Sequence, residues 1–186
     1  MHLLRQYIRS ILHESPSIRR PYQSKLRVFD FDDTLVKTGS KIHVTDASGK
    51  TFDLTPGEYA VYVPTPGDQF DYSDFEKLVD PQTIQWTAKI LRNITDKGGE
   101  VVILTARANP QPVREFLQQA RLPDLEVVAL GDSNPEKKAD YIRDRIEMDG
   151  LEHVEFFDDS YKNIEAVRRL QGEFPTLNLV VRHITH

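Results

Sequence analysis

Cysteine is missing from all 186 residues of this chain. Its absence excludes disulfide frameworks, cysteine-based zinc sites and thiol nucleophiles together. Long apolar runs are missing as well: the longest, such as Val101–Leu104, are only a few residues, whereas a membrane span needs about 20. Positive charge is in deficit, with 24 Lys and Arg residues against 29 Asp and Glu residues, which argues against a broad nucleic-acid surface. We therefore expect a cytoplasmic protein that neither enters a membrane nor wraps an extended duplex.

What is present is the composition of a globular protein. Hydrophobic residues make up 39% of the chain and charged residues 28%. At roughly 100–200 residues per domain, the length predicts one domain with room for a small insertion. Residues 1–25 are set apart as an amphipathic helix, at about 2–13, followed by a linker. We expect this helix to pack on the domain or on a second copy of the chain, which would give self-association.

Beyond residue 25, short apolar strands alternate with helical patterns. The candidate strands are Leu26–Phe31, Glu100–Thr105, Leu125–Leu130, His153–Phe157 and Leu177–Ile184. Between them, Asp80-Pro81 predicts the start of one helix, and a capping box at residues 133–136 predicts the start of another. This alternation predicts an α/β fold in which right-handed crossovers wind helices onto both faces of a parallel, Rossmann-like sheet. Ligands of such doubly wound folds bind beyond the C-terminal ends of the strands.

Residues 37–80 break the alternation. They hold six of the 17 aromatic residues, and eight acidic residues against four lysines. The runs Ile42–Asp46 and Thr51–Leu54, on either side of a turn, predict a β-hairpin. A structureless loop of this length would be unusual, so we expect an ordered flap or small cap. Its aromatic side chains either form a small core of their own or line the mouth of a substrate site.

An acidic segment, Asp30-Phe31-Asp32-Asp33-Thr34, follows the first predicted strand. Side chains alternate between the faces of an extended chain, so we expect Asp30 and Asp32 to point the same way. Two carboxylates so close together repel each other unless a cation or a proton lies between them. The fourth predicted strand ends in a second acidic pair, Asp158-Asp159. Oxygen ligands without His or Cys favour a hard metal ion, and therefore Mg²⁺.

Hydroxyl, amide and basic side chains accompany these acidic strand ends. Thr105 ends the second predicted strand, where its hydroxyl can donate to an anionic oxygen, although a lone threonine there is more often a cap. Arg107 follows it, and Asn163 comes shortly after the second acidic pair. Lys137 and Lys138 open a helix, where lysines are usually solvated. We expect Lys138 to point into the site, because it shares a helix face with an apolar residue four positions on.

Together these segments resemble the haloacid dehalogenase (HAD) superfamily of phosphatases. The segment from Asp30 matches its D-x-D-x-T signature. Thr105 matches its second motif, Lys138 its third, with Lys137 as the close competitor, and Asp158-Asp159 its acidic fourth motif. The resemblance covers about residues 26–184. It implies a HAD-like strand order of 5-4-1-2-3, a catalytic domain over residues 26–186, and a small cap or flap at about residues 37–80.

The resemblance also implies a mechanism. Asp30 attacks phosphorus and forms an aspartyl-phosphate. Asp32 protonates the leaving oxygen and then activates water. Thr105 and Lys138 hold the transferred phosphoryl oxygens.

Metal ligands and substrate contacts follow from the same resemblance. Mg²⁺ would be bound by Asp30, the backbone carbonyl of Asp32 and Asp159, with Asp158 orienting the site. The candidate substrate contacts are Thr34, Arg107, Lys137 and Asn163, of which Arg107 could grip a second or terminal phosphate.

The acid at position 32 favours phosphate-ester hydrolysis among the activities of the superfamily. The Thr-Ala-Arg form of the second motif is similar to HAD domains that repair nucleic-acid ends or dephosphorylate nucleotides. The acidic flap argues against a long polynucleotide, so we expect a Mg²⁺-dependent phosphatase acting on a small phosphorylated substrate or a nucleic-acid end. The alternative is a non-catalytic module that binds phosphate or a partner on a HAD scaffold.

Overall fold

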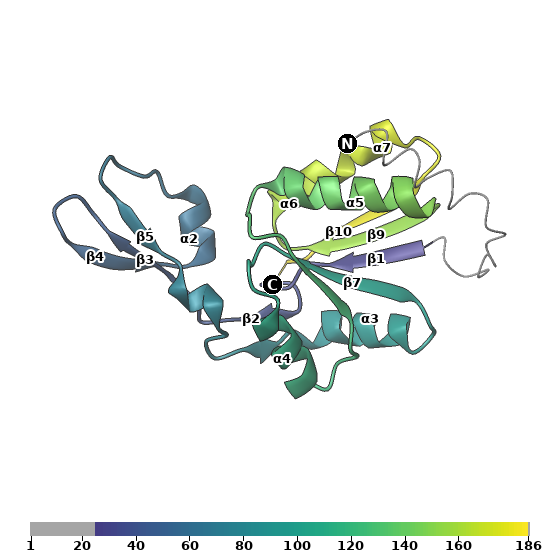
Figure 1. The fold of residues 1–186 in the computed structure, drawn as a ribbon, viewed down its shortest axis with the longest axis horizontal. Coiled ribbons are helices and arrows are strands. Elements are labelled where there is room, and N and C mark those ends of the chain that lie inside the picture. The colour runs from purple at the N-terminus through teal and green to yellow at the C-terminus, as the bar shows by residue number, and fades with distance from the viewer. Residues whose placement is uncertain (1–24, 186) are drawn as a thin grey trace, which may run out of the picture.

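The computed structural model describes residues 25–185, so the helix expected at about residues 2–13 lies outside the described residues. Five parallel strands form the central sheet, in the order β10-β9-β1-β7-β8 (Figure 1). Their bounds are Lys25–Phe29 for β1, Glu100–Thr105 for β7, Glu126–Ala129 for β8, His153–Asp158 for β9 and Asn178–His183 for β10. Each of the five predicted strands is present, with its ends displaced by two residues or fewer.

Helices cover both faces of this sheet. On one face lie α3 (Gln85–Thr95) and α4 (Gln111–Gln119), and on the other α5 (Pro135–Asp149), α6 (Tyr161–Arg168) and the short α7 (Leu170–Glu173). The α/β class with a mostly parallel, helix-covered sheet is therefore confirmed. None of the helices in the described part of the chain is both long enough and apolar enough to cross a membrane.

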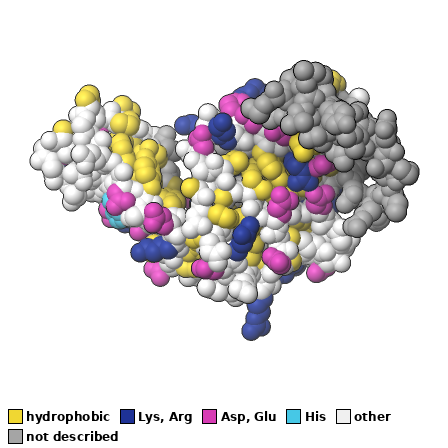
Figure 2. All heavy atoms as spheres, in the orientation of Figure 1, with side chains coloured by type: hydrophobic (Ala, Val, Ile, Leu, Met, Phe, Trp, Pro, Cys, Tyr) yellow, Lys and Arg dark blue, Asp and Glu magenta, His cyan; other side chains and the backbone are white. Residues whose placement is uncertain are grey.

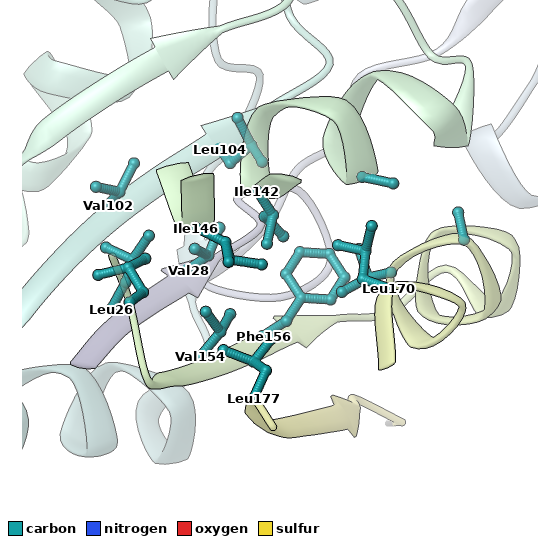
Figure 3. Packing of buried hydrophobic residues seen from close by; sticks show 14 of the residues in the cluster. Leu26, Val28, Val102, Leu104, Ile142, Ile146, Val154, Phe156, Leu170 and Leu177 are labelled. Atoms are coloured by element: carbon teal, nitrogen blue, oxygen red, sulfur yellow. The ribbon is translucent and has the colours of Figure 1, made fainter. Parts of the chain in front are cut away.

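The period-two pattern of the strands divides the core into two layers. Leu26 and Val28 of β1 face α5 and α6, where they pack with residues such as Ile142 and Phe156 (Figure 3). Phe29 faces the layer of α3 and α4, where its ring stacks on Phe157 of β9 with centroids 4.1 Å apart. Strands β1 and β9 are thus packed on both faces, which fixes the position of their C-terminal ends.

One predicted helix start is wrong, and at another helix the start is confirmed but the form of the cap differs. Asp80-Pro81 does not begin a helix: Asp80 has a φ of 43°, and the next residues form strand β6 (Gln82–Thr83), so α3 begins only at Gln85. The capping box at residues 133–136 is replaced by a simpler cap, in which the side chain of Asn134 accepts the N–H of Glu136. Pairing of β6 with β2 (Val36–Lys37) explains the first error. These two strands are far apart in the sequence, so no pattern close to Asp80 indicates that they pair.

The flap, which we define as residues 37–80, is a small unit beyond the C-terminal ends of the sheet strands (Figure 1). It contains β3 (Ile42–Thr45), β4 (Thr51–Leu54), α2 (Pro56–Val61), β5 (Gln69–Asp71) and the 3-10 helix η1 (Ser73–Glu76). The predicted hairpin is β3 paired with β4, and β5 adds an antiparallel third strand on the other edge of β3. The flap is therefore ordered, as expected from its length.

Aromatic rings form the centre of the flap. Phe70 contacts the rings of Tyr59, Tyr62 and Tyr72, with centroids 5.5–6.3 Å apart, and Phe52 contacts Tyr62. Of the two roles left open for these residues, the structure shows the first in part: these rings pack on one another while remaining half-buried or exposed, whereas Phe75 lies against Arg107. In Figure 2 a notch separates the flap from the rest of the molecule, and hydrophobic side chains of the flap gather beside it.

Candidate active site

The end of β1 places two acidic side chains at the edge of the sheet. The Asp30 N–H donates to the Phe157 carbonyl at 2.9 Å, so Asp30 is still fixed to β9 although the strand has ended. The chain then turns sharply, because the Phe31 carbonyl accepts the N–H groups of Leu35 at 2.9 Å and Val36 at 3.2 Å. Because of this turn, the strand ends at Phe29, two residues before the predicted Phe31. Asp30 and Asp32, which were expected to point the same way, form hydrogen bonds with different partner residues.

Lys138 lies between two carboxylates. Its Nζ donates to Asp30 Oδ1 at 2.5 Å and to Asp158 Oδ2 at 2.8 Å. The Lys138 side chain is 4% exposed, and those of Asp30 and Asp158 are 8% and 0% exposed. Lys137 is exposed to solvent, so the structure selects Lys138, as its shared face with Ile142 predicted. The ammonium of Lys138 thus forms strong, charge-assisted hydrogen bonds to carboxylates at the ends of β1 and β9.

Burial and charge shift the proton equilibria of this group. Burial disfavours the charged form of Lys138, but the charges of Asp30 and Asp158 outweigh it and raise its pKa above the ordinary value. Burial also raises the pKa of Asp30 well above its ordinary value, and Lys138 opposes this only in part. Lys138 therefore stays protonated, whereas burial works against the charged form of Asp30.

Asp158 is held by polar groups on every side. Its Oδ1 accepts the backbone N–H of Ser160 at 2.8 Å, and Asn163 Nδ2 donates to both oxygens, at 3.0 and 3.1 Å. Together with Lys138, these bonds fix the carboxylate in one orientation. The structure thus brings Asn163 to Asp158, and its expected contact with substrate stays a prediction.

Asp159 completes a group of three carboxylates. One oxygen of each of Asp30, Asp158 and Asp159 lies within 4.8 Å of the others. Burial, followed by the charges of Asp158 and Asp33, raises the pKa of Asp159 to about 6. Three carboxylates beside the single ammonium of Lys138 leave two negative charges when all are ionised. An all-oxygen group of this charge fits a divalent hard cation such as Mg²⁺.

Thr105 and Arg107 approach the same place from the end of β7. Thr105 is buried, and its Oγ1 accepts the backbone N–H of Arg107 at 3.2 Å, which leaves the hydroxyl proton to donate elsewhere. The Arg107 guanidinium forms a bidentate pair with Asp32, with Nε–Oδ2 at 2.8 Å and Nη2–Oδ1 at 2.7 Å. The sequence patterns marked both residues, but nothing in them indicated this pairing across 75 positions.

Besides Lys137, Thr34 is the remaining predicted substrate contact. It is fully buried, its carbonyl accepts the hydroxyl of Thr87 at 2.6 Å, and its own Oγ1 has no hydrogen-bond partner among the described residues. A direct role for Thr34 in substrate binding stays a prediction, as does one for the exposed Lys137.

Comparison with known proteins adds no assignment. None of the protein-family models scanned matches this chain, and a search of curated proteins returns no significant match. The arrangement of the side chains therefore carries the functional argument.

Proposed function

We propose that this protein is a Mg²⁺-dependent phosphatase of the HAD type, which hydrolyses a phosphate monoester through an aspartyl-phosphate. The observation that carries the proposal is the buried Asp30–Lys138–Asp158 array, with Asp159 beside it, at the C-terminal edge of a parallel sheet. The strand order β10-β9-β1-β7-β8 supports it, because counted along the chain it is the 5-4-1-2-3 order that the family resemblance implies.

In the first step, an oxygen of Asp30 attacks phosphorus, and the bond between phosphorus and the leaving oxygen breaks. Asp32 gives its proton to that oxygen, so the leaving group departs as an alcohol. Lys138 and Thr105 donate hydrogen bonds to the phosphoryl oxygens, whose charge is spread during transfer. Lys138 reaches this position because its Nζ is already bonded to Asp30.

In the second step, water attacks the phosphorus of the aspartyl-phosphate, and its proton returns to Asp32. The bond between phosphorus and Asp30 breaks, which releases inorganic phosphate and restores both aspartates. Asp158 keeps Lys138 in place through both steps, because Ser160 and Asn163 fix its orientation.

Asp30, Asp159 and the backbone carbonyl of Asp32 are the groups that would hold Mg²⁺. When bound, the ion supplies positive charge that screens the carboxylates from the incoming phosphate. The raised pKa values of Asp30 and Asp159 support this assignment, since a nearby cation is what would keep both groups ionised.

A small phosphate monoester, such as a nucleotide or a nucleic-acid end, suits the site best. The flap carries eight acidic residues and four lysines, so an extended polyanion would meet repulsion there. Hydrophobic side chains of the flap lie beside the notch, where they offer contact area for an uncharged leaving group (Figure 2).

The decisive experiment compares Asp30→Asn with Asp32→Asn, using an aryl phosphate and Mg²⁺. The Asp30→Asn variant should lose phosphoryl transfer, because an amide is a poor nucleophile. The Asp32→Asn variant should release a burst of about one aryl alcohol per site and then stall, since water attack loses a base worth typically 10²–10⁴-fold. Mass spectrometry of the acid-quenched protein should find a phosphate that hydroxylamine removes.

Three results would contradict the proposal. Full activity of Asp30→Asn would show that another group is the nucleophile. Wild-type turnover by Asp32→Asn would assign the proton transfers elsewhere. No turnover by the wild-type protein on a panel of phosphorylated metabolites and end-phosphorylated oligonucleotides, with Mg²⁺ bound, would favour the non-catalytic binding module.

A further inference from the structure

Arg107 makes contacts that the proposed reaction does not account for. Besides its two bonds to Asp32, its Nη1 donates to the carbonyls of Phe75 at 2.7 Å and Lys77 at 3.1 Å. Four of its five N–H groups are therefore engaged, and the side chain is 2% exposed. The guanidinium also lies 5.3 Å from the ring centroid of Phe75 and 5.8 Å from that of Phe31.

Its partners belong to two separate parts of the molecule. Asp32 belongs to the turn after β1, whereas Phe75 and Lys77 belong to the segment by which the chain leaves the flap. This outgoing segment is also bonded to the incoming one: the Gly39 N–H donates to the Val79 carbonyl at 2.8 Å, and Ser40 Oγ donates to the Asp74 carbonyl at 3.2 Å. We call these two paired segments, residues 39–40 and 74–79, the flap base; a displacement of the flap base would move the carbonyls that accept from Nη1 of Arg107.

We propose that Arg107 is a positioning residue that fixes the carboxylate of Asp32 and makes its orientation depend on how the base of the flap is placed. The inference rests on the proposed function, in which Asp32 is the acid and base. A bidentate pair uses one lone pair on each carboxylate oxygen, so a second lone pair remains on each for proton transfer. Arg107 thus fixes the orientation of the carboxylate plane and leaves one lone pair free on each of the two oxygens.

This role differs from the grip on a second phosphate that the sequence suggested for Arg107. A guanidinium that already makes four hydrogen bonds, and is almost without exposure, would have to break bonds to Asp32 or to the flap before it could bind an anion. Asp32, in contrast, has a side chain that is 26% exposed, so its carboxylate remains open to a reacting group.

The test combines Arg107→Met with Asp32→Asn in a double-mutant cycle. If Arg107 acts through Asp32, Arg107→Met should give the same pattern as Asp32→Asn: the aryl phosphate burst is kept, and the following steady state falls by about 10²-fold, the scale of a roughly 1 Å misplacement. The double variant should then be no slower than Asp32→Asn alone. Arg107→Lys should not restore the rate, because an ammonium cannot form a bidentate pair.

A second variant tests the connection to the flap. Asp74→Ala removes the carboxylate that accepts the Lys41 N–H at 3.1 Å, and it loosens the flap base without changing any group that touches Arg107. We expect a smaller loss of steady-state rate, about 3–10-fold, which should disappear in the Asp32→Asn background. The Asp74→Ala variant tests the role of Arg107 even if Arg107→Met does not fold.

Arg145→Met is the matched control. Arg145 is also a partly buried arginine paired with carboxylates, but its partner Glu100 begins β7, at the opposite edge of the sheet from Thr105. It should lower the melting temperature and leave the ratio of burst to steady state unchanged.

Each other outcome overturns a specific claim. A raised KM with an unchanged burst ratio, or losses that multiply in the double variant, would make Arg107 a substrate contact. An equal loss of both steps that tracks melting temperature, as in Arg145→Met, would make it only structural. If wild type and Asp32→Asn behave as proposed while the cycle is additive, only this inference fails. If wild type shows no phosphatase activity, both proposals fail.

Discussion

The body of the protein, which we define as residues 25–36 and 81–185, and its flap are stabilised in different ways. The body buries two continuous layers of aliphatic and aromatic side chains, one on each face of the sheet. Among the described residues of the flap, the buried hydrophobic ones are Ile42 and Val44, and its rings contact each other at the surface. Polar hydrogen bonds add to these contacts, such as the reciprocal cap between Thr55 and Glu58.

Because of this difference, we expect the body to be rigid and the flap to be more easily deformed. Burial of apolar area is the main favourable contribution to folding, so the body holds Asp30, Lys138 and Asp158 on a rigid frame. Units with few buried contacts open at lower free energy, so we expect the flap to open more readily than the body. The residues between the two, above all Arg107, are where a motion of the flap can reach the site.

The largest effect is expected inside the body. Replacing Lys138 by Met leaves Asp30 and Asp158 buried without their cation, and losing one partner of a buried ion pair costs about 3–5 kcal/mol. Denaturant unfolding should show this loss, and phosphatase activity should vanish. The control Lys137→Met changes an exposed residue, so its stability should stay within about 0.5 kcal/mol of wild type. Similar losses in the two variants would reverse the assignment.

A pair of core truncations compares the two regions directly. Ile142→Ala creates a cavity in the body and should lower global stability by about 2–5 kcal/mol. Phe70→Ala removes the ring at the centre of the flap, which is only half-buried, so we expect faster amide exchange in residues 42–72 with little change in β1 or β9. If the denaturant midpoint of Phe70→Ala fell as far as that of Ile142→Ala, the flap and the body would unfold as one unit.

Mg²⁺ should stabilise the body in a pH-dependent way. The pKa of Asp159 is raised to about 6 from an ordinary value of 3.8, so its protonated form favours the metal-free fold, and that contribution is lost as the pH rises through about 6. Mg²⁺ needs the carboxylate, so its stabilisation should grow over the same interval, to about 1.4 kcal/mol at ten times its Kd. Melting curves at pH 5 and 7.5, with and without Mg²⁺, measure this, and Asp159→Asn should flatten the dependence.

The smallest effect is expected at the surface of the flap. His43 Nδ1 lies 2.7 Å from Asp53 and its Nε2 lies 3.6 Å from Asp74, and the bond to Asp53 raises the pKa of His43 above 6.5. A raised histidine pKa stabilises the fold below the ordinary value, and this contribution is lost as the pH rises through the raised one. The protection of flap amides, corrected for the intrinsic pH dependence of exchange, should therefore fall slightly as the pH rises past 6.5, and His43→Gln should remove that step.

Local patterns were sufficient to locate most of the site. The apolar runs of three strands can be recognised in the sequence, and at their ends lie Asp30, Thr105 and Asp158. Parallel strands bring such ends to one edge of the sheet. Helical periodicity distinguished Lys138 from Lys137, because only one of them shares a face with Ile142. The start of α3 was misplaced because β6 forms only by pairing with β2, which no local pattern encodes.

The sequence by itself determined the class of the fold, the five strands and the acidic residues at their ends, because these depend on periodicities of two and 3.6 residues within short windows. The tertiary structure alone decided the partners. It placed Lys138 between Asp30 and Asp158, set the rings of the flap against one another, and paired Arg107 with Asp32 and with the carbonyls of the flap base. The contacts of Lys138 and Arg107 join residues 20 to 108 positions apart, and chain folding rather than local preference brings them together.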